Sequence, residues 1–205
     1  MKVLFTIAIF LSSFSLQALT LDGVEIRNVI AATANAPELQ LKGASIRRAY
    51  AIVDTYVGQL YVENAELDAE ALIAANEARR MVFHVVSNRV SARRFTNAIN
   101  EGLSINISPE QMADIKPRVE RLVDLFDHKF VKGTIGYIQW YPKTQMSHIV
   151  IDGVEKGSVP GKDLNDAMLK IWIGDHPVSE RFKREVLGLS EPDYDEDEED
   201  DDDDF

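Results

Sequence analysis

The chain of 205 residues contains no cysteine. This absence excludes a disulfide framework, thiolate metal sites and a cysteine nucleophile. The histidines are also few and widely spaced, and they form no HExxH or other close metal-ligand pattern: His84, His128, His148 and His176. The sequence lacks the GxSxG, GxxxxGK[ST] and GxGxxG motifs as well. We therefore expect no metal site, no cofactor, and neither nucleotide-binding nor hydrolase chemistry of these types.

Long apolar runs are scarce. The most apolar run, Val3 to Leu11, is interrupted by Thr6, is preceded by Lys2, and leads through small polar residues to Ala18. It is shorter than the ~18–20 apolar residues that cross a bilayer. This pattern predicts a cleavable secretory signal peptide over residues 1–18 rather than a membrane anchor. We expect a periplasmic mature protein without a membrane span, cleaved within a few residues of Ala18.

Basic residues are outnumbered, at 22 against 34 acidic ones, for a net charge of −12. Twelve of the acidic residues lie in 191–205, which has no basic residue, whereas residues 19–190 hold 22 acidic and 21 basic side chains. This nearly neutral body argues against nucleic-acid binding. We expect one domain over 19–190 and a disordered acidic tail over 191–205. A solvated tail is the simplest interpretation, with a protein partner or a weakly bound cation as alternatives.

The hydrophobic pattern predicts a mixed α and β domain. Strands are expected over 39–41, 51–62 and 80–86, and a β-meander over 133–159 with a tight turn at Asp152-Gly153. Gly43 is interpreted as a turn between the first two strands. Helices are expected over 67–78, 91–103, 164–173 and 178–187, the last two ending at Gly174 and Gly188.

The strongest helix signal covers residues 108–126. Ser108 is typical of an N-cap, Pro109 of the first helical position, and Gln111 completes a capping box. Pro117 falls inside this pattern, and it predicts a kink or two helices end to end.

Arg47 is a candidate binding residue in the segment LQLKGASIRR. Strand alternation would direct Arg47 and Ile46 to opposite faces. If Arg47 points inward, its guanidinium requires an anion nearby. Either an internal Asp or Glu or the carboxylate of a fatty acid would serve, and the spacing alone favours the internal pair.

Several segments resemble the chalcone isomerase-like family. They are LxLxGASIR and TYVGQLYVE in the first half, then YIQWYP, IDGVEKGSVPG and IWIGDHPVSERFKREVLG in the second half, where the likeness is to the bacterial exported branch. The resemblance extends over about residues 37–188. It implies an α+β fold in which a large antiparallel sheet packs against a layer of helices, with a cleft between them.

The family contains isomerases, which close a chalcone to a flavanone, and non-catalytic members, which bind fatty acids through an arginine. The resemblance implies that Arg47 is that arginine and that Asn100 is the active-site asparagine. Other positions depart from the isomerase pattern. Arg93 replaces a tyrosine, and Tyr56 and Ile171 replace threonines. Most of the hydroxyl groups that would hold a water and the ketone are therefore missing.

These observations favour a periplasmic, non-catalytic protein that binds a fatty acid or a similar amphipathic acid. Arg47 would hold the carboxylate with help from Tyr56 or Tyr61, and the aliphatic chain would lie between sheet and helices. One alternative is an isomerase (an intramolecular lyase) that acts on an unknown substrate. The other is an interaction module of the cell envelope that docks through the acidic tail.

Overall fold

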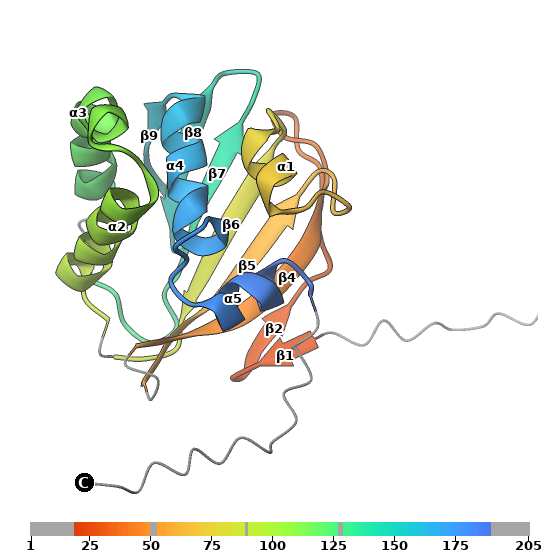
Figure 1. Cartoon of the computed structure of the whole chain (residues 1–205). Coiled ribbons are helices and arrows are strands. Elements are labelled where there is room, and N and C mark those ends of the chain that lie inside the picture. Colours follow the sequence, from red (N-terminus) through yellow and green to blue (C-terminus); the bar gives the residue numbers. More distant parts are fainter. Residues whose placement is uncertain (1–18, 50–52, 89, 127–128, 190–205) are drawn as a thin grey trace, which may run out of the picture.

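The computed structural model describes residues 19–49, 53–88, 90–126 and 129–189. Within them, seven antiparallel strands form one curved sheet whose spatial order follows the chain (Figure 1). These strands are β3 (Val29–Ile30), β4 (Leu39–Ala49), β5 (Val53–Val62), β6 (Arg79–Val85), β7 (Ile135–Tyr141), β8 (Met146–Ile151) and β9 (Val154–Pro160). The expected strands and the β-meander are confirmed. The left-handed Asp152 and Gly153, at φ 50° and 77°, form the predicted turn between β8 and β9.

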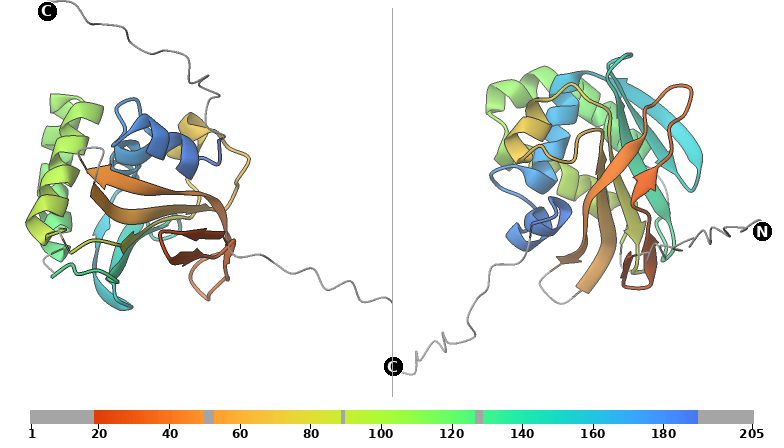
Figure 2. Two further views of the ribbon diagram at one scale, coloured as in Figure 1. Left: turned by 90° about the horizontal axis from the view of Figure 1, so that it is seen from below. Right: turned by 90° about the vertical axis from the view of Figure 1, so that its right-hand side faces the viewer.

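The described residues form five helices. They cover one face of this sheet (Figure 2). They are α1 (Ala69–Ala74), α2 (Ala92–Asn106), α3 (Pro109–Leu125), α4 (Lys162–Ile173) and α5 (Glu180–Val186). The main hydrophobic core lies between the helices and the sheet. This arrangement confirms the expected α+β class. None of the described helices is both long and apolar enough to cross a bilayer.

The opposite face of the sheet carries a small hairpin of β1 (Leu19–Leu21) and β2 (Val24–Ile26) (Figure 2). Val24 and Ile26 pack there with Val57 of β5. The sequence did not predict β1, β2 or β3, since strands of two or three residues are too short to show an alternating pattern.

The capping box of α3 is present. The backbone N–H of Gln111 donates to Ser108 Oγ at 3.2 Å, and the Ser108 N–H donates to Gln111 Oε1 at 3.0 Å. Pro117 lies on the exposed side of a single continuous helix. Of the two predicted alternatives, a kink or two helices end to end, the second is therefore wrong. Pro117 has no backbone N–H to donate to the preceding turn. Buried Ile115 and Val119, two residues before and after it, pack into the core and hold the helix there.

Gly43 is not a turn; it lies inside β4, where the register with β5 shifts between Leu41 and Gly43. A Cβ at Gly43 would lie 2.2 Å from the backbone oxygen of Glu185 and 2.8 Å from the backbone nitrogen of Gly188. The glycine is therefore required by the close approach of α5 and not by its own backbone angles. This contact fixes α5 over β4.

Replacing Gly43 by alanine should force α5 away from the sheet. We expect Gly43→Ala to lower the free energy of unfolding by about 1–3 kcal/mol, the usual effect of overpacking, in urea denaturation. Gln40→Ala is the control, because Gln40 lies in the same strand with an exposed side chain. The control should change stability by less than about 0.5 kcal/mol. Equal effects of the two substitutions would contradict the close contact.

Candidate functional site

Arg47 lies directly opposite Tyr56 in the ladder between β4 and β5. Ser45, which points the same way two residues earlier, is fully buried beneath α5 and donates to Glu185 Oε2. Arg47 therefore faces the helix-covered side, whereas Ile46 packs on the opposite face beside the β1–β2 hairpin. The predicted alternation is confirmed.

The half-buried Arg47 has no carboxylate partner among the described residues, and its guanidinium donates to the carbonyl of Arg48. The internal ion pair that the spacing favoured is thus not found in this part of the chain. A guanidinium without a carboxylate partner can pair with an anion from outside the described chain.

Tyr56 is buried beside this arginine. Its hydroxyl oxygen accepts a hydrogen bond from Trp172 Nε1 of α4 at 3.0 Å, and its ring packs edge-on against Phe83 and Phe182. Burial raises the pKa of the Tyr56 hydroxyl, opposed by the hydrogen bond from Trp172 and by the charge of Arg47. The hydroxyl is therefore protonated at neutral pH, and no described residue accepts its hydrogen.

The structure separates the other two predicted site residues from Arg47. Tyr61 lies on the opposite face of the sheet, where its hydroxyl donates to the carbonyl of Arg27 at 2.9 Å and contacts Gln59 Oε1 at 2.7 Å. Asn100 is exposed on the outer side of α2, whose buried residues include Ile99 and Leu103. Neither side chain is placed to touch a ligand that Arg47 and Tyr56 hold.

Of the positions that depart from the isomerase pattern, only Tyr56 provides a hydroxyl near Arg47. Arg93 is exposed in the first turn of α2. Ile171 is buried in α4 against Gly102 of α2, where a Cβ on the glycine would lie 2.8 Å from the isoleucine side chain. Arg93 is therefore part of the exposed surface, and Ile171 is part of the contact between α2 and α4.

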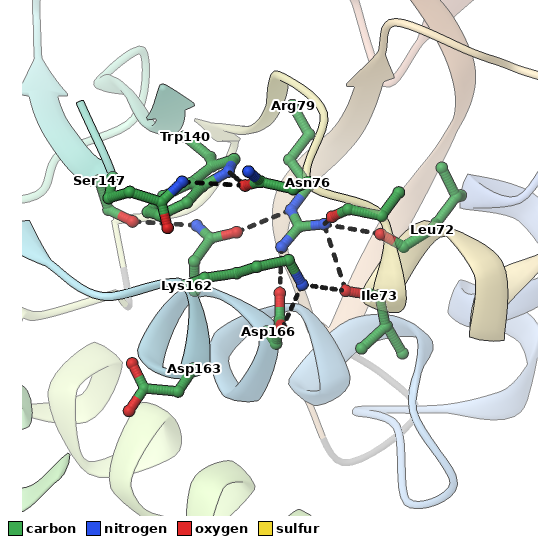
Figure 3. A network of polar contacts seen from close by, with 12 residues as sticks. Leu72, Ile73, Asn76, Arg79, Trp140, Ser147, Lys162, Asp163 and Asp166 are labelled. Atoms are coloured by element: carbon green, nitrogen blue, oxygen red, sulfur yellow. Dashed lines mark hydrogen bonds and ion pairs between the residues drawn. The ribbon is translucent and has the colours of Figure 1, made fainter. Parts of the chain in front are cut away.

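Arg79 was missed in the sequence analysis, and it is the most heavily bonded charged group in the described part of the interior. Figure 3 shows it at the centre of a polar network between β6, α1 and α4. Its guanidinium donates to the carbonyls of Leu72 at 2.6 Å and Ala75 at 3.0 Å, at the C-terminal end of α1. It also donates to Asn165 Oδ1 at 2.7 Å and pairs with Asp166. The alternation of β6, in which Arg79 is in phase with buried Met81, could have identified it.

The same network continues along α4. Lys162 pairs with Asp166 at 2.6 Å, and it donates to the carbonyl of Ile73 at 3.2 Å. Asn165 donates to Ser147 Oγ of β8 at 3.0 Å. Burial lowers the pKa of Arg79, opposed chiefly by Asp166. Arg79 is thus neutralised internally, and it fastens two helices to the sheet.

A void of about 20 Å³ lies between α4 and the sheet, lined by Arg79, Asn165 and Trp172 together with aliphatic and methionine side chains. This volume holds about one water molecule. An acyl chain therefore requires movement of the side chains between α4 and the sheet. Met81 and Met168 line the void and are suited to such repacking, because thioether side chains adapt to irregular spaces.

A larger hollow of about 360 Å³ lies at the edge of β4, between β1 and α5. Ala44 and Ile46 line this hollow, and Arg181 is the arginine that lines it. Arg181 pairs with Glu185 at 3.0 Å and donates to the carbonyl of Ile46 at 3.0 Å. This hollow therefore offers a neutralised arginine, in contrast to Arg47.

Comparison with known proteins places this geometry in a family. A sequence profile described as chalcone isomerase-like matches residues 18–188. The chain belongs to the chalcone isomerase-like family. A solved structure of a fatty-acid binding protein from Arabidopsis thaliana has a similar fold, with a TM-score of 0.67 and 17% sequence identity over 83% of this chain and 96% of that chain. No curated protein sequence matches.

These matches confirm the chalcone isomerase-like fold that the sequence segments predicted. The bacterial exported branch stays a prediction, as do the ligand roles of Arg47, Tyr56, Tyr61 and Asn100. The predicted signal peptide and the whole of the predicted acidic tail, residues 191–205, lie outside the described residues, as does His128.

The buried network around Arg79 predicts a large structural effect of its removal. Arg79→Met leaves Asp166 and the carbonyls at the end of α1 without their main donor, so we expect a loss of about 3–5 kcal/mol in urea unfolding. The control is Arg48→Met, which removes an exposed pair with Asp54 at 2.7 Å and should cost less than about 1 kcal/mol. A loss for Arg79→Met no larger than that of the control would contradict the structural role.

Proposed function

We propose that this chalcone isomerase-like protein binds an amphipathic carboxylic acid, with a fatty acid as the representative ligand. One observation carries the proposal. Arg47, which has no carboxylate partner in the described chain, lies beside Tyr56, whose buried hydroxyl donates its hydrogen to none of the described residues. A carboxylate between them accepts from both groups and balances the charge of Arg47.

The fold comparison supports the same class of ligand. The Arabidopsis thaliana protein of similar fold is a fatty-acid binding protein. In the present chain, the helix-covered face beside Tyr56 is lined by aromatic and aliphatic side chains of the main core, including Phe83 and Phe182. A ligand with a carboxylate at one end and a hydrocarbon chain at the other matches this sequence of polar and apolar contacts.

The hydrocarbon chain enters by opening the contact between α4 and the sheet. Trp172 lies between the void and the proposed carboxylate site. It lines the void, and its indole N–H donates to the Tyr56 hydroxyl. A bound carboxylate would reorient the Tyr56 hydroxyl, and an acyl chain would displace Trp172, Met81 or Met168 from the void. Binding should therefore change the fluorescence of Trp172.

We propose that the protein is not an isomerase. The positions that would carry catalytic hydroxyls hold Arg93, which is exposed, and Ile171, which is buried against α2. Asn100 is exposed on α2. Tyr56 alone gives one hydroxyl to a ligand, which suffices for a hydrogen bond to an anion and not for a positioned water and ketone.

Substitution of Arg47 tests the ligand site. Arg47→Gln should weaken the binding of saturated C12–C18 fatty acids by at least about tenfold, because a charge-assisted hydrogen bond contributes about 1.5–3 kcal/mol. Tyr56→Phe should weaken it by about fivefold through loss of a neutral donor. Isothermal titration and native mass spectrometry measure both effects, and Trp172 fluorescence reports the accompanying movement.

The chain offers matched controls for both substitutions. Arg48→Gln changes the adjacent arginine, which is exposed and paired with Asp54, and Tyr61→Phe changes a tyrosine on the opposite face. Fatty-acid affinity should be unchanged in both. The proposal fails if the purified protein carries and takes up no acyl ligand, or if Arg47→Gln binds as the wild type does. Consumption of a chalcone above the spontaneous rate would instead support an isomerase.

We propose further that the protein is exported and that its working compartment is the periplasm. Lys2, the apolar run Val3–Leu11 and the small polar residues before Ala18 support this proposal. Full-length protein expressed in a bacterial host should appear in the periplasmic fraction with an intact mass that lacks about 18 residues. A charged substitution in the run, such as Ile7→Arg, should retain the precursor in the cytoplasm. Recovery of an uncleaved cytoplasmic wild-type chain would contradict export.

A further inference from the structure

The acidic residues 191–205 begin beside the strand that holds Arg47. A Cβ on Gly188 would lie 2.7 Å from the carbonyl oxygen of Lys42, so the chain passes β4 at Lys42 just before Leu189, the last described residue. Arg47 follows Lys42 by five residues in the same strand. At roughly 3.3 Å per residue, this separation is about 16 Å. The acidic segment and the candidate ligand site are therefore neighbours along β4.

The acidic segment is long enough to cover this distance. Its residues 195–204 read DEDEEDDDDD, and we call them the acidic run. A chain spans at most about 3.3–3.6 Å per residue, so the seven residues from Gly188 to Asp195 span up to about 25 Å. Every carboxylate of the acidic run can thus reach Arg47.

The elements that border this path are basic. β4 contains three basic side chains and no acidic one, and α5, which lies over β4, contains three basic and two acidic side chains. Asp54 of β5, which pairs with Arg48 at 2.7 Å, adds one negative charge. The balance of these residues is +3, whereas the acidic run carries ten negative charges. Attraction between them favours a position of the acidic run close to β4.

The guanidinium of Arg47 is open to a further carboxylate. Its neighbour Arg48 already pairs with Asp54. Arg181 of α5 likewise pairs with Glu185, at 3.0 Å. Arg47 has no carboxylate partner among the described residues, and it donates to the carbonyl of Arg48. A new carboxylate therefore displaces only a neutral acceptor at Arg47, whereas it displaces an anion at the other two arginines.

Tethering and repetition compensate for the weakness of one such contact. A single ion pair at a solvent-accessible site contributes little. Attachment to the same chain gives the acidic run a roughly millimolar effective concentration at Arg47. Its ten successive carboxylates offer ten ways to make the pair. The run contains no apolar side chain, so it cannot fill the space between α4 and the sheet, and a fatty acid, which has both parts, can replace it.

We propose that a carboxylate of the acidic run pairs with Arg47 in the ligand-free protein and is displaced when a fatty acid binds. The run is then an internal competitor that lowers the affinity for the ligand, and salt weakens the competition. The contact between the run and Arg47 follows from charge and reach, whereas its effect on affinity rests on the proposed function.

Neutralisation of the acidic run tests the competition on the full chain. The variant changes each Asp of residues 195–204 to Asn and each Glu to Gln. Isothermal titration should show that it binds dodecanoate at least about threefold more tightly than the wild type, because a site that is free in one third of the molecules binds threefold more weakly. The gain should disappear in about 0.5 M sodium chloride, which screens the ion pair.

The same neutralisation in an Arg47→Gln background is the control. The residual affinity for dodecanoate should then stay within about 1.5-fold, since the acidic run no longer has the group for which it competes. An equal gain in both backgrounds would mean that the acidic run only repels the fatty acid by long-range charge, and it would overturn the proposal.

A chemical link tests the contact itself and needs no fatty acid. Arg47→Lys keeps the positive charge and introduces an amine, which a water-soluble carbodiimide joins to a carboxylate in direct contact. Peptide mass spectrometry should find position 47 linked to the acidic run at least about fivefold more often than Lys143 is, because the pair raises the local concentration of carboxylate.

Lys143 is a control at a comparable distance from the start of the acidic segment. It is exposed in the turn between β7 and β8. Three strand spacings of about 4.8 Å separate this end of β7 from the start of β4. The tether therefore reaches both positions, and only a specific contact distinguishes them.

The two measurements separate this proposal from the proposed function. If the protein binds no fatty acid and position 47 is still linked to the acidic run, the proposed function fails and the contact stands. If dodecanoate binds but neutralisation leaves its affinity unchanged, the competition is overturned and the proposed function stands. A link at position 47 no more frequent than at Lys143 would also overturn the proposal.

Discussion

The buried guanidinium of Arg79 connects the elements on which the candidate site depends. Its hydrogen bonds join the central strand β6 to the end of α1 and to Asn165 and Asp166 in the first half of α4. Since Trp172 lies in the same helix, nearly two turns after Asn165 and Asp166, this attachment also positions Trp172. Trp172 then donates to Tyr56, the neighbour of Arg47. A structural arginine and a candidate ligand-binding arginine are in this way linked through one helix.

Strand alternation gives neighbouring residues of the same type different roles. Arg47 faces the helix layer and lacks a carboxylate partner in the described chain, while Arg48 faces outward and pairs with Asp54. Tyr56 is buried in the main core, and Tyr61 belongs to a small cluster on the opposite face. Burial raises the pKa of Tyr61 to about 12, opposed by its hydrogen bond to the carbonyl of Arg27. The Tyr61 hydroxyl is already hydrogen-bonded to Arg27 and Gln59, so Tyr61 has a structural role on that face.

The sequence was informative wherever a local pattern decides the structure. The capping box at Ser108, the alternation around Arg47 and the turn at Asp152 each depend on residues close in the chain, and each is present. It was misleading where a distant element decides. Gly43 has the appearance of a turn residue, and it is required instead by α5, which lies more than 130 residues later in the chain. Contacts of that kind leave no local periodicity.

The two arginines that face the helix layer show the same limit. The alternation of β6 could place Arg79 inside, but its partner Asp166 is 87 residues away, on a helix whose rotation the sequence does not specify. For Arg47, spacing favoured an internal acid that the described residues do not supply. The packing of α4 and α5 therefore decides whether an inward-facing arginine pairs with an acidic residue of the chain or stays available to a ligand. The sequence alone does not distinguish these two cases.

Charge balance at Arg47 also distinguishes between classes of ligand. A neutral ketone would accept a hydrogen bond from Tyr56, yet it would leave the positive charge of Arg47 without a counter-charge in a partly dehydrated place. A carboxylate accepts from both groups and supplies that counter-charge. Burial raises the pKa of Tyr56 and so keeps its proton, which means that the site presents one fixed cation and one neutral donor. Under the proposed function, this combination would favour a monovalent anion, and the apolar residues beyond Tyr56 would favour one with a hydrocarbon chain.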